Sequence, residues 1–235
     1  MPVASLTEIR PTPLRSSSAG LGRAALRLGL FARVHAQLRL KLTLLVILTL
    51  LFCVPYFLIG YFPIRPPQPL PLTALDRAIP FDVRWCPVYQ SLYLLIPLAP
   101  FLITSRRALV RYVSAFTLIT ATGLAICFLF PTLCPRPTDF PSAGLYALVI
   151  AYDPPTNAFP SMHIALALQS LLLGIHMLRT ETSRWLWPLS ILGTLWLLAI
   201  AYSTLATKQH YAVDLLAGAF LAGLCHVTVF RGRAA

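Results

Sequence analysis

The sequence predicts an all-α protein, a bundle of six transmembrane helices with both termini in the cytoplasm. Of its 235 residues, 57% are hydrophobic and only 11% are charged, with a mean hydropathy of +0.74. A soluble domain of this length cannot bury so much apolar surface. Six apolar runs each approach the ~20 residues that a helix needs to cross a bilayer, and the basic residues gather on one side of these runs.

The N-terminal segment differs in composition from the rest of the chain. Residues 1–20 are rich in Pro, Ser and Arg, which predicts disorder. Residues 21–41 mix apolar and basic side chains, which suits either a helix lying on an anionic lipid surface or a solvated juxtamembrane segment. We therefore expect a basic arm over residues 1–42, a membrane domain over residues 43–230 and a basic tail over residues 231–235.

Hydropathy and helix-breaking residues place the six spans and the loops between them. The first span is too long, and too far from the N-terminus, for a cleaved signal peptide. A proline-rich loop with a short helical candidate at 73–79 follows it, and a long loop over 131–159 precedes the fourth span. The expected spans are 43–62, 88–104, 112–130, 160–178, 185–202 and 211–230.

The distribution of Lys and Arg predicts the orientation of the bundle. With six spans, both termini and two of the connections lie on one side of the membrane. Of the 19 Lys and Arg residues, only five fall on the other side: Arg65, Arg77, Arg84, Arg136 and Lys208. The positive-inside rule therefore places both termini in the cytoplasm and the 131–159 loop outside. The small size and short loops favour a bacterial inner membrane, with the loop in the periplasm.

The net charge of +12 raises the question of a nucleic-acid partner. The positive residues lie beside apolar runs rather than among solvated aromatic positions, so we expect the N-terminal basic arm to bind anionic lipid and the chain to bind no nucleic acid. The five cysteines show no metal-binding spacing. Cys86 and Cys134 fall near the same membrane face, which leaves a disulfide between them open. The sequence does not predict an oligomeric state.

The segment 203–214 gathers a cation, an imidazole and a carboxylate between two apolar runs. His210 and Asp214 are four residues apart, so on a helix they share one face and the carboxylate can hold the ring. One ring nitrogen then carries its proton toward Asp214, and the other is free to act as a base or nucleophile. A purely structural polar pair has the same spacing. The location of the other polar groups decides between these interpretations.

Another polar cluster opens the fourth span, with the sequence Phe159-Pro160-Ser161-Met162-His163. A proline at the first helical position is favourable, and the backbone N–H groups that follow it have no partner within the helix. Together with the helix dipole they form an anion site. Ser161 adds a hydroxyl donor and His163 a titratable ring, although an interfacial histidine that only caps the helix fits the same pattern.

Two cations complete the predicted site. Arg136 lies between two prolines that restrict its backbone, and its planar guanidinium suits bidentate binding of phosphate. Pairing of Arg136 with Asp139 or with lipid headgroups is the alternative. Lys208 can likewise either bind phosphate or pair with an acidic residue or lipid headgroups. Because successive spans alternate in direction, both cations and both histidines meet at the non-cytoplasmic face, and such a set suits phosphoryl transfer.

These motifs resemble those of a known family. Pro-Ser-Met-His at 160–163 and His-x-x-x-Asp at 210–214 each open a late transmembrane helix. They are similar to the second and third motifs of the type 2 phosphatidic acid phosphatase superfamily. That family comprises six-span lipid phosphatases and related sphingolipid headgroup transferases, such as inositol phosphorylceramide synthase and sphingomyelin synthase. The likeness covers roughly residues 43–230.

The resemblance implies an enzyme that needs no metal and no cofactor. It implies that His210 accepts the phosphate, that Asp214 orients His210, and that His163 serves as the acid and base. Ser161 and Arg136 would bind the phosphate of the lipid substrate.

Three positions depart from the family pattern. Met162 stands where the second motif usually has Gly, a form closer to the transferase-like branch. The first motif, Lys-x6-Arg-Pro, has Leu129 in the place of its Lys, and the third has Thr204 in the place of its Arg. Lys208 is the nearby residue that we expect to supply the missing charge at the phosphate.

We therefore expect an integral-membrane lipid phosphate phosphatase with a phosphohistidine intermediate. The first alternative passes phosphate, or a phospho-headgroup, to a lipid or alcohol acceptor. A transporter with a His/Asp proton relay is disfavoured, because transporters bind near the membrane midplane and these residues lie at span ends. A metal site made by His163, His210 and Asp214 is disfavoured, because two adjacent cations would repel a divalent ion.

The charge asymmetry predicts the result of a topology assay. A reporter fused after Ala235 should report a cytoplasmic location. In a variant without the five native cysteines, a single cysteine placed in the 140–150 region should react with an impermeant reagent in intact cells. Labelling only after permeabilisation would place this loop inside and contradict a site on the outer face.

Overall fold

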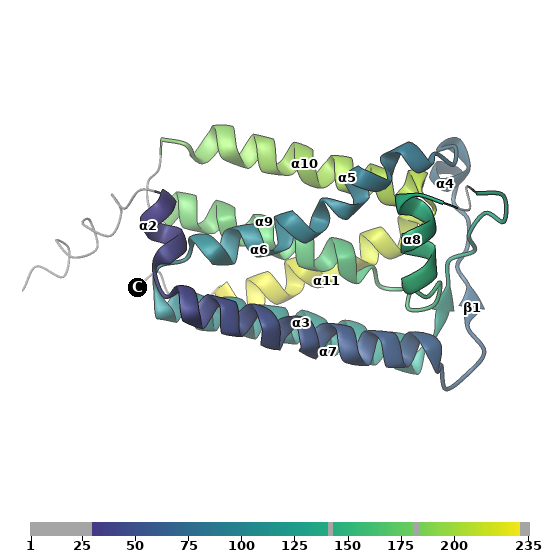
Figure 1. The fold of residues 1–235 in the computed structure, drawn as a ribbon, viewed down its shortest axis with the longest axis horizontal. Coiled ribbons are helices and arrows are strands. Elements are labelled where there is room, and N and C mark those ends of the chain that lie inside the picture. Colours follow the sequence, from purple (N-terminus) through teal and green to yellow (C-terminus); the bar gives the residue numbers. More distant parts are fainter. Residues whose placement is uncertain (1–29, 141–142, 181–183, 231–235) are drawn as a thin grey trace, which may run out of the picture.

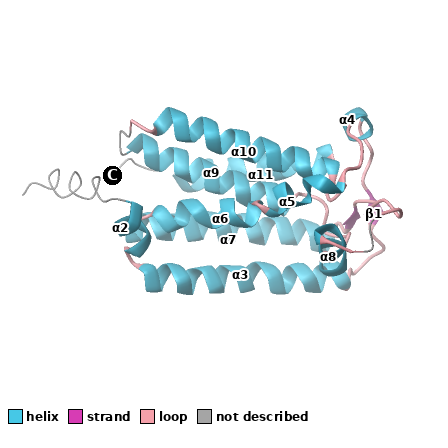
Figure 2. Cartoon of the chain, turned by 45° about the horizontal axis from the view of Figure 1, so that its top comes forward, coloured by secondary structure: helices cyan, strands magenta, loops and turns pink. Residues whose placement is uncertain are grey.

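A computed structural model describes residues 30–140, 143–180 and 184–230 of the chain. These residues form a bundle of long, roughly parallel helices, with short helices and a pair of short strands at one end (Figure 1, Figure 2). Six helical segments are long and apolar enough to cross a membrane. The prediction of an all-α, six-span bundle is therefore confirmed, while its orientation in the membrane stays a prediction.

The elements follow in the order α2 (Leu30–His35), α3 (Leu38–Tyr61), β1 (Gln68–Pro69), α4 (Ala74–Ala78), a 3-10 turn (Val83–Trp85), α5 (Cys86–Gln90), α6 (Leu92–Leu102), α7 (Arg106–Leu129), β2 (Thr132–Leu133), α8 (Leu145–Tyr152), α9 (Met162–Thr180), α10 (Leu186–Ala206) and α11 (Ala212–Phe230). The second span comprises the 3-10 turn, α5 and α6. α2 and the end of α11 lie at one end of the bundle, and α4, α8 and β1 lie at the other (Figure 1).

Three spans begin five or six residues earlier than expected, and one of them is α3, which begins at Leu38 rather than at 43. α7 begins at Arg106 rather than at 112, because Arg favours helix and its long side chain can carry the charge to the membrane surface. The second span begins at Val83 rather than at 88, and it is interrupted at Ser91. The Ser91 hydroxyl donates to the Val88 carbonyl at 2.6 Å, and such local bonds compete with a continuous helix.

The 131–159 segment contains more structure than the loop that the sequence suggested. It includes the helix α8, whose Tyr146 and Val149 are buried. It also includes β2, which pairs in parallel with β1 (Figure 1). An apolar stretch of eight residues is too short to be recognised as a helix by periodicity alone. Its packing against the end of the bundle decides its conformation.

The short helix expected at 73–79 is confirmed as α4. Thr73 and Asp76 form a capping box, in which each side chain accepts a hydrogen bond from the backbone N–H of the other residue. The buried Asp76 carboxylate also accepts a hydrogen bond from the backbone N–H of Ala212, at 2.8 Å. One carboxylate therefore joins the loop after the first span to the start of α11.

Part of the predicted basic arm lies outside the described residues, which begin at Leu30. In the described part, residues 38–41 belong to the first span, because α3 begins at Leu38 and buries Lys41. The Lys41 ammonium donates to the carbonyls of Arg33 and Phe101, both at 2.7 Å. A buried cation needs such partners, and this one ties the ends of α2 and α6 to the start of α3.

The disulfide that the sequence left open does not form. Cys86 and Cys134 are free thiols, like the other three cysteines. The Cys134 thiol donates instead to the carbonyl of Lys208 at 3.6 Å, and burial raises the pKa of this thiol.

α9 is the central helix and packs against α6, α7, α10 and α11. Its close approach to α11 depends on Gly218. A Cβ at this position would lie 2.3 Å from the carbonyl oxygen of Ser161, which is a backbone atom and cannot rotate away. At Gly223, on the same helix, a Cβ would meet nothing within 4 Å.

This contrast predicts the effect of two matched substitutions. Gly218→Ala should push α11 away from the start of α9 and destabilise the fold by about 1–3 kcal/mol, as overpacking typically does. Gly223→Ala should leave stability unchanged or slightly improved, since Ala favours helix more than Gly does. Thermal unfolding in detergent micelles measures both effects. Equal unfolding temperatures for the two variants would contradict this packing.

Candidate active site

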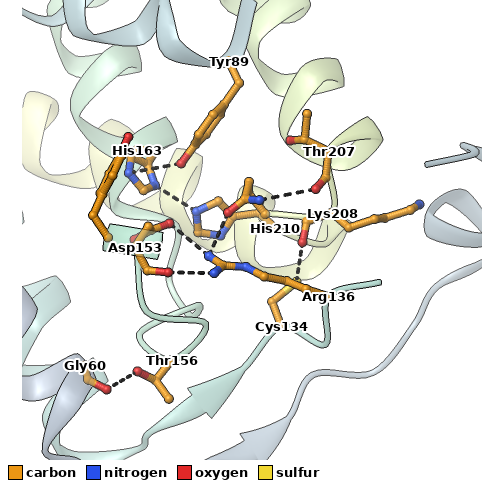
Figure 3. Close-up of polar contacts among 12 residues, drawn as sticks. Gly60, Tyr89, Cys134, Arg136, Asp153, Thr156, His163, Thr207, Lys208 and His210 are labelled. Atoms are coloured by element: carbon orange, nitrogen blue, oxygen red, sulfur yellow. Dashed lines mark hydrogen bonds and ion pairs between the residues drawn. The ribbon is translucent and has the colours of Figure 1, made fainter. Parts of the chain in front are cut away.

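The polar residues predicted from the sequence lie where α7 and α10 end and α9 and α11 begin. Figure 3 shows His163, His210 and Arg136 side by side at this end of the bundle. Ser161 joins them through its backbone N–H, which donates to the carbonyl of Asp214 at 3.0 Å. The structure therefore brings together five of the six predicted residues, from three separate parts of the chain.

The two histidines and Asp214 form a continuous chain of hydrogen bonds. His210 Nδ1 lies 2.9 Å from Asp214 Oδ2, and His210 Nε2 lies 2.9 Å from His163 Nδ1. Asp214 is fully buried, and the His163 and His210 rings are only 6% and 4% exposed. Since α11 begins at Ala212, His210 precedes the helix, and the pair does not share one helical face as expected. The bond joins the α10–α11 connection to the first turn of α11.

His163 has a second hydrogen-bond partner, which the sequence did not single out. The hydroxyl of Tyr89, in α5, lies 3.4 Å from His163 Nε2 (Figure 3). The Tyr89 ring also meets the His163 ring edge to face, with centroids 5.6 Å apart. A lone tyrosine near the start of an apolar span carries no signal of such a contact, because only the packing of α5 against the bundle creates it.

Ser161 occupies the N-cap of α9. Its hydroxyl accepts from the backbone N–H of Ile164 at 3.4 Å, and its carbonyl accepts the first helical bond, from Ala165. Pro160 therefore precedes the helix and does not occupy the first helical position as expected. The backbone N–H groups of Met162 and His163, in the first turn of α9, have no partner within the helix, and a helix N-terminus suits an anion.

The Arg136 guanidinium is anchored by two residues that the sequence did not identify. It donates to the Asp153 carbonyl at 2.6 Å, to Asp153 Oδ2 at 3.1 Å and to Gln209 Oε1 at 2.7 Å (Figure 3). Asp153, rather than Asp139, is therefore its acidic partner. Within the described part of the chain, the buried Nε–H of Arg136 has no hydrogen-bond partner, so this donor is available to an anion.

Asp153 is held from a second side by Tyr56, whose hydroxyl donates to Oδ1 at 2.9 Å. Burial raises the pKa of the Asp153 carboxyl above its usual value, and the charge of Arg136 and the Tyr56 bond oppose this rise. Asp153 directly follows α8. Because α8 was not predicted, no sequence pattern indicated that Asp153 lies near the site.

Lys208 does not join the two histidines. Its ammonium donates to the carbonyls of Asp76 and Ile79, at 2.8 and 2.6 Å, and so caps the end of α4. Its side chain points away from His210 in Figure 3. Lys208 has a φ of +54°, a left-handed conformation that turns the chain just before His210. The structure gives this cation a role in joining α4 to the α10–α11 connection.

The other departures from the motif pattern also have a structural explanation. The Thr204 hydroxyl donates to the Ala201 carbonyl at 2.7 Å within α10, and Leu129 is 52% exposed. Met162 is buried against Gly123, where a Cβ would lie 2.0 Å from its sulfur. Glycine on α7 therefore provides the space that a bulkier residue at 162 requires.

Of the comparisons with protein families, curated proteins and solved structures, one gives a match. Among the residues that the structure describes, no three His, Cys, Asp or Glu side chains are placed to hold a metal ion. No curated protein and no solved structure matches the chain. A family model described as the PAP2 superfamily matches residues 70–228, which cover every residue of the candidate site except Tyr56. The chain therefore belongs to the PAP2 superfamily, the superfamily of the type 2 phosphatidic acid phosphatases.

Proposed function

We propose that this membrane protein is a lipid phosphate phosphatase that forms a phosphohistidine at His210. Membership of the PAP2 superfamily supports phosphoryl transfer in general. The choice of a lipid substrate rests on one further observation, an apolar cavity of about 160 Å³ that lies between α3, α6, α7 and α9.

The lining of the cavity suits a hydrocarbon chain. His163 and Asp153 line it at the end near the candidate site, and Lys41 lines it at the far end. Lys41 and Tyr56, which both line it, are 15 residues apart on α3 and so about 22 Å apart along the helix. Most other lining side chains are apolar. A soluble phosphate ester would leave its hydroxyl groups unsatisfied there, whereas a lipid tail would not.

In the first step of the proposed reaction, His210 Nε2 attacks the phosphorus and the ester P–O bond breaks. With the phosphate bound, His163 has taken up a proton from solvent and is protonated on both ring nitrogens; it delivers the proton from Nδ1 to the departing oxygen and keeps the proton on Nε2. Asp214 holds the Nδ1–H of His210 and stabilises the positive charge that develops on the ring. His163 Nδ1 and His210 Nε2 lie 2.9 Å apart, so the phosphate has to enter between them and separate the rings.

In the second step, a water molecule attacks the phosphohistidine and the P–N bond breaks. His163 Nδ1 takes the proton from this water, which restores the starting state. The Arg136 Nε–H, the Ser161 hydroxyl and the first N–H groups of α9 are the donors that would bind the phosphate oxygens in both steps.

An alcohol that replaces water in the second step would make the protein a phosphotransferase. Met162, in the position where the family's second motif usually has Gly, favours this alternative, since that form is closer to the transferase-like branch. Incubation of the purified protein with a panel of lipid phosphates, with and without alcohols, separates the two functions. Release of inorganic phosphate alone supports the phosphatase, and a new phosphorylated lipid supports the transferase.

The proposed roles of the two histidines predict different responses to the leaving group. His163→Ala should abolish most turnover of a lipid phosphate, whose alkoxide needs a proton, and should retain much of the activity on a small aryl phosphate, whose phenolate needs none. His210→Ala should be inactive on both substrates, because no leaving group can replace the nucleophile. Phosphate release is the measurement.

Two controls belong to this experiment. Asp214→Asn should be severely impaired on both substrates through a misoriented ring, and chelation of divalent metals should change none of the activities. An active His210→Ala enzyme, or an equal loss on both substrates for His163→Ala, would show that the roles are misassigned.

The geometry also predicts that Arg136 and Lys208 differ in function. Arg136→Lys should lower kcat by about 10²–10³, the usual loss for one oxyanion donor, because an ammonium cannot reproduce the guanidinium fork. Lys208→Met should lower the unfolding temperature in micelles more than it lowers kcat of the folded enzyme. A loss of kcat in Lys208→Met as large as that of Arg136→Lys would return Lys208 to the phosphate site.

A further inference from the structure

Tyr89 is one of the most deeply buried tyrosines in the described chain, with a side chain that is 1% exposed. It lies in α5, a separate short helix before the interruption at Ser91. Trp196 of α10 holds this interruption by donating from its indole nitrogen to the Ser91 hydroxyl at 2.8 Å. α5 also packs against α10. The phenol is thereby fixed against His163.

The hydrogen-bond chain assigns each proton when it is followed from Asp214. The Asp214 carboxylate can only accept, so His210 Nδ1 carries a proton and His210 Nε2 is an acceptor in the neutral ring. His163 Nδ1, 2.9 Å from this acceptor, must then be the donor. In the neutral His163 ring, Nε2 is left without a proton and accepts from the hydroxyl of Tyr89.

We propose that Tyr89 is a positioning residue that binds His163 Nε2 and thereby keeps Nδ1, the nitrogen that exchanges the proton, facing the reacting phosphate. The four groups form one relay in which Tyr89 donates to His163, His163 to His210, and His210 to Asp214. This inference rests on the proposed function, since it assigns the group that controls the acid and base of that reaction.

A hydroxyl suits this position through the whole reaction. When His163 is protonated on both nitrogens, or has given its Nδ1 proton to the leaving group, Nε2–H donates and the Tyr89 oxygen accepts. In the resting protein, where neutral His163 carries its proton on Nδ1, Nε2 accepts and Tyr89 donates. A hydroxyl serves both states by rotation of its proton, whereas a carboxylate or a carbonyl oxygen can only accept. Without the hydroxyl, Nε2 would be a buried polar atom without a hydrogen-bond partner, which would destabilise His163 in each of its protonation states.

The test compares Tyr89→Phe with the control Tyr202→Phe. Tyr202, in α10, packs against Trp85 and does not line the apolar cavity, and its substitution should leave activity unchanged. Tyr89→Phe should lower kcat on a lipid phosphate about tenfold, the upper range for one hydrogen bond, and should lower kcat on an aryl phosphate much less. In the His163→Ala background, Tyr89→Phe should have no further effect on either substrate, because Tyr89 acts through His163.

A second measurement does not depend on the folding of any variant. Nitrogen-15 NMR of histidine-labelled wild-type protein in micelles, with signals assigned by the His163→Ala variant, reports the tautomer of neutral His163. We expect the proton on Nδ1. A proton on Nε2, an equal loss on both substrates for Tyr89→Phe, or additive losses in the double variant would overturn the proposal.

Failure of the proposed function has a different signature. If His210→Ala retained activity, or if no phosphate became bound to histidine during turnover, the nucleophile would be wrong. The tautomer of His163 in the resting protein would still test the hydrogen-bond chain by itself.

Discussion

The bond between His210 and Asp214 is the interaction on which the candidate site depends. Asp214 is fully buried, and an ionised carboxylate in such a place is costly unless it is paired and hydrogen-bonded. His210 is its side-chain partner, at 2.9 Å. Because this pairing fixes one ring nitrogen, it also determines which nitrogen of His210 faces His163. This one buried carboxylate therefore determines which ring nitrogens of His210 and His163 carry a proton in the resting hydrogen-bond chain.

The short elements at the end of the bundle hold this pair in place. Asp76 accepts from the backbone at the start of α11, and Lys208 caps α4 from the other direction. Arg136 joins Asp153 to Gln209, the residue before His210. Each of these contacts links a loop to the α10–α11 connection, so the position of His210 is determined from several sides. Polar groups that satisfy one another away from water also make the site rigid.

The candidate phosphate site has fewer cationic side chains than the family motifs prescribe. Leu129 and Thr204 stand where the motifs have cations, and the Lys208 ammonium is engaged by backbone carbonyls. Arg136 is thus the cation that the described structure places beside the two histidines, and Asp153 partly neutralises it. In the proposed reaction, hydrogen-bond donors from Ser161 and the first turn of α9 would therefore have a larger share in binding the phosphate. Their position at a helix N-terminus suits that share.

Composition and the spacing of apolar runs determined the class of this protein, because a bilayer imposes a helix length and an apolar surface that any sequence reveals. The motifs at 160–163 and 210–214 identified the two histidines, Asp214 and Ser161, since each motif is a short pattern of neighbouring residues. Tyr89, Asp153 and Gln209 became visible only in the tertiary structure, as did the true partners of Lys208. Their contacts join segments distant in sequence, and only the packing of α5 and α8 against the bundle, which no local pattern encodes, brings them together.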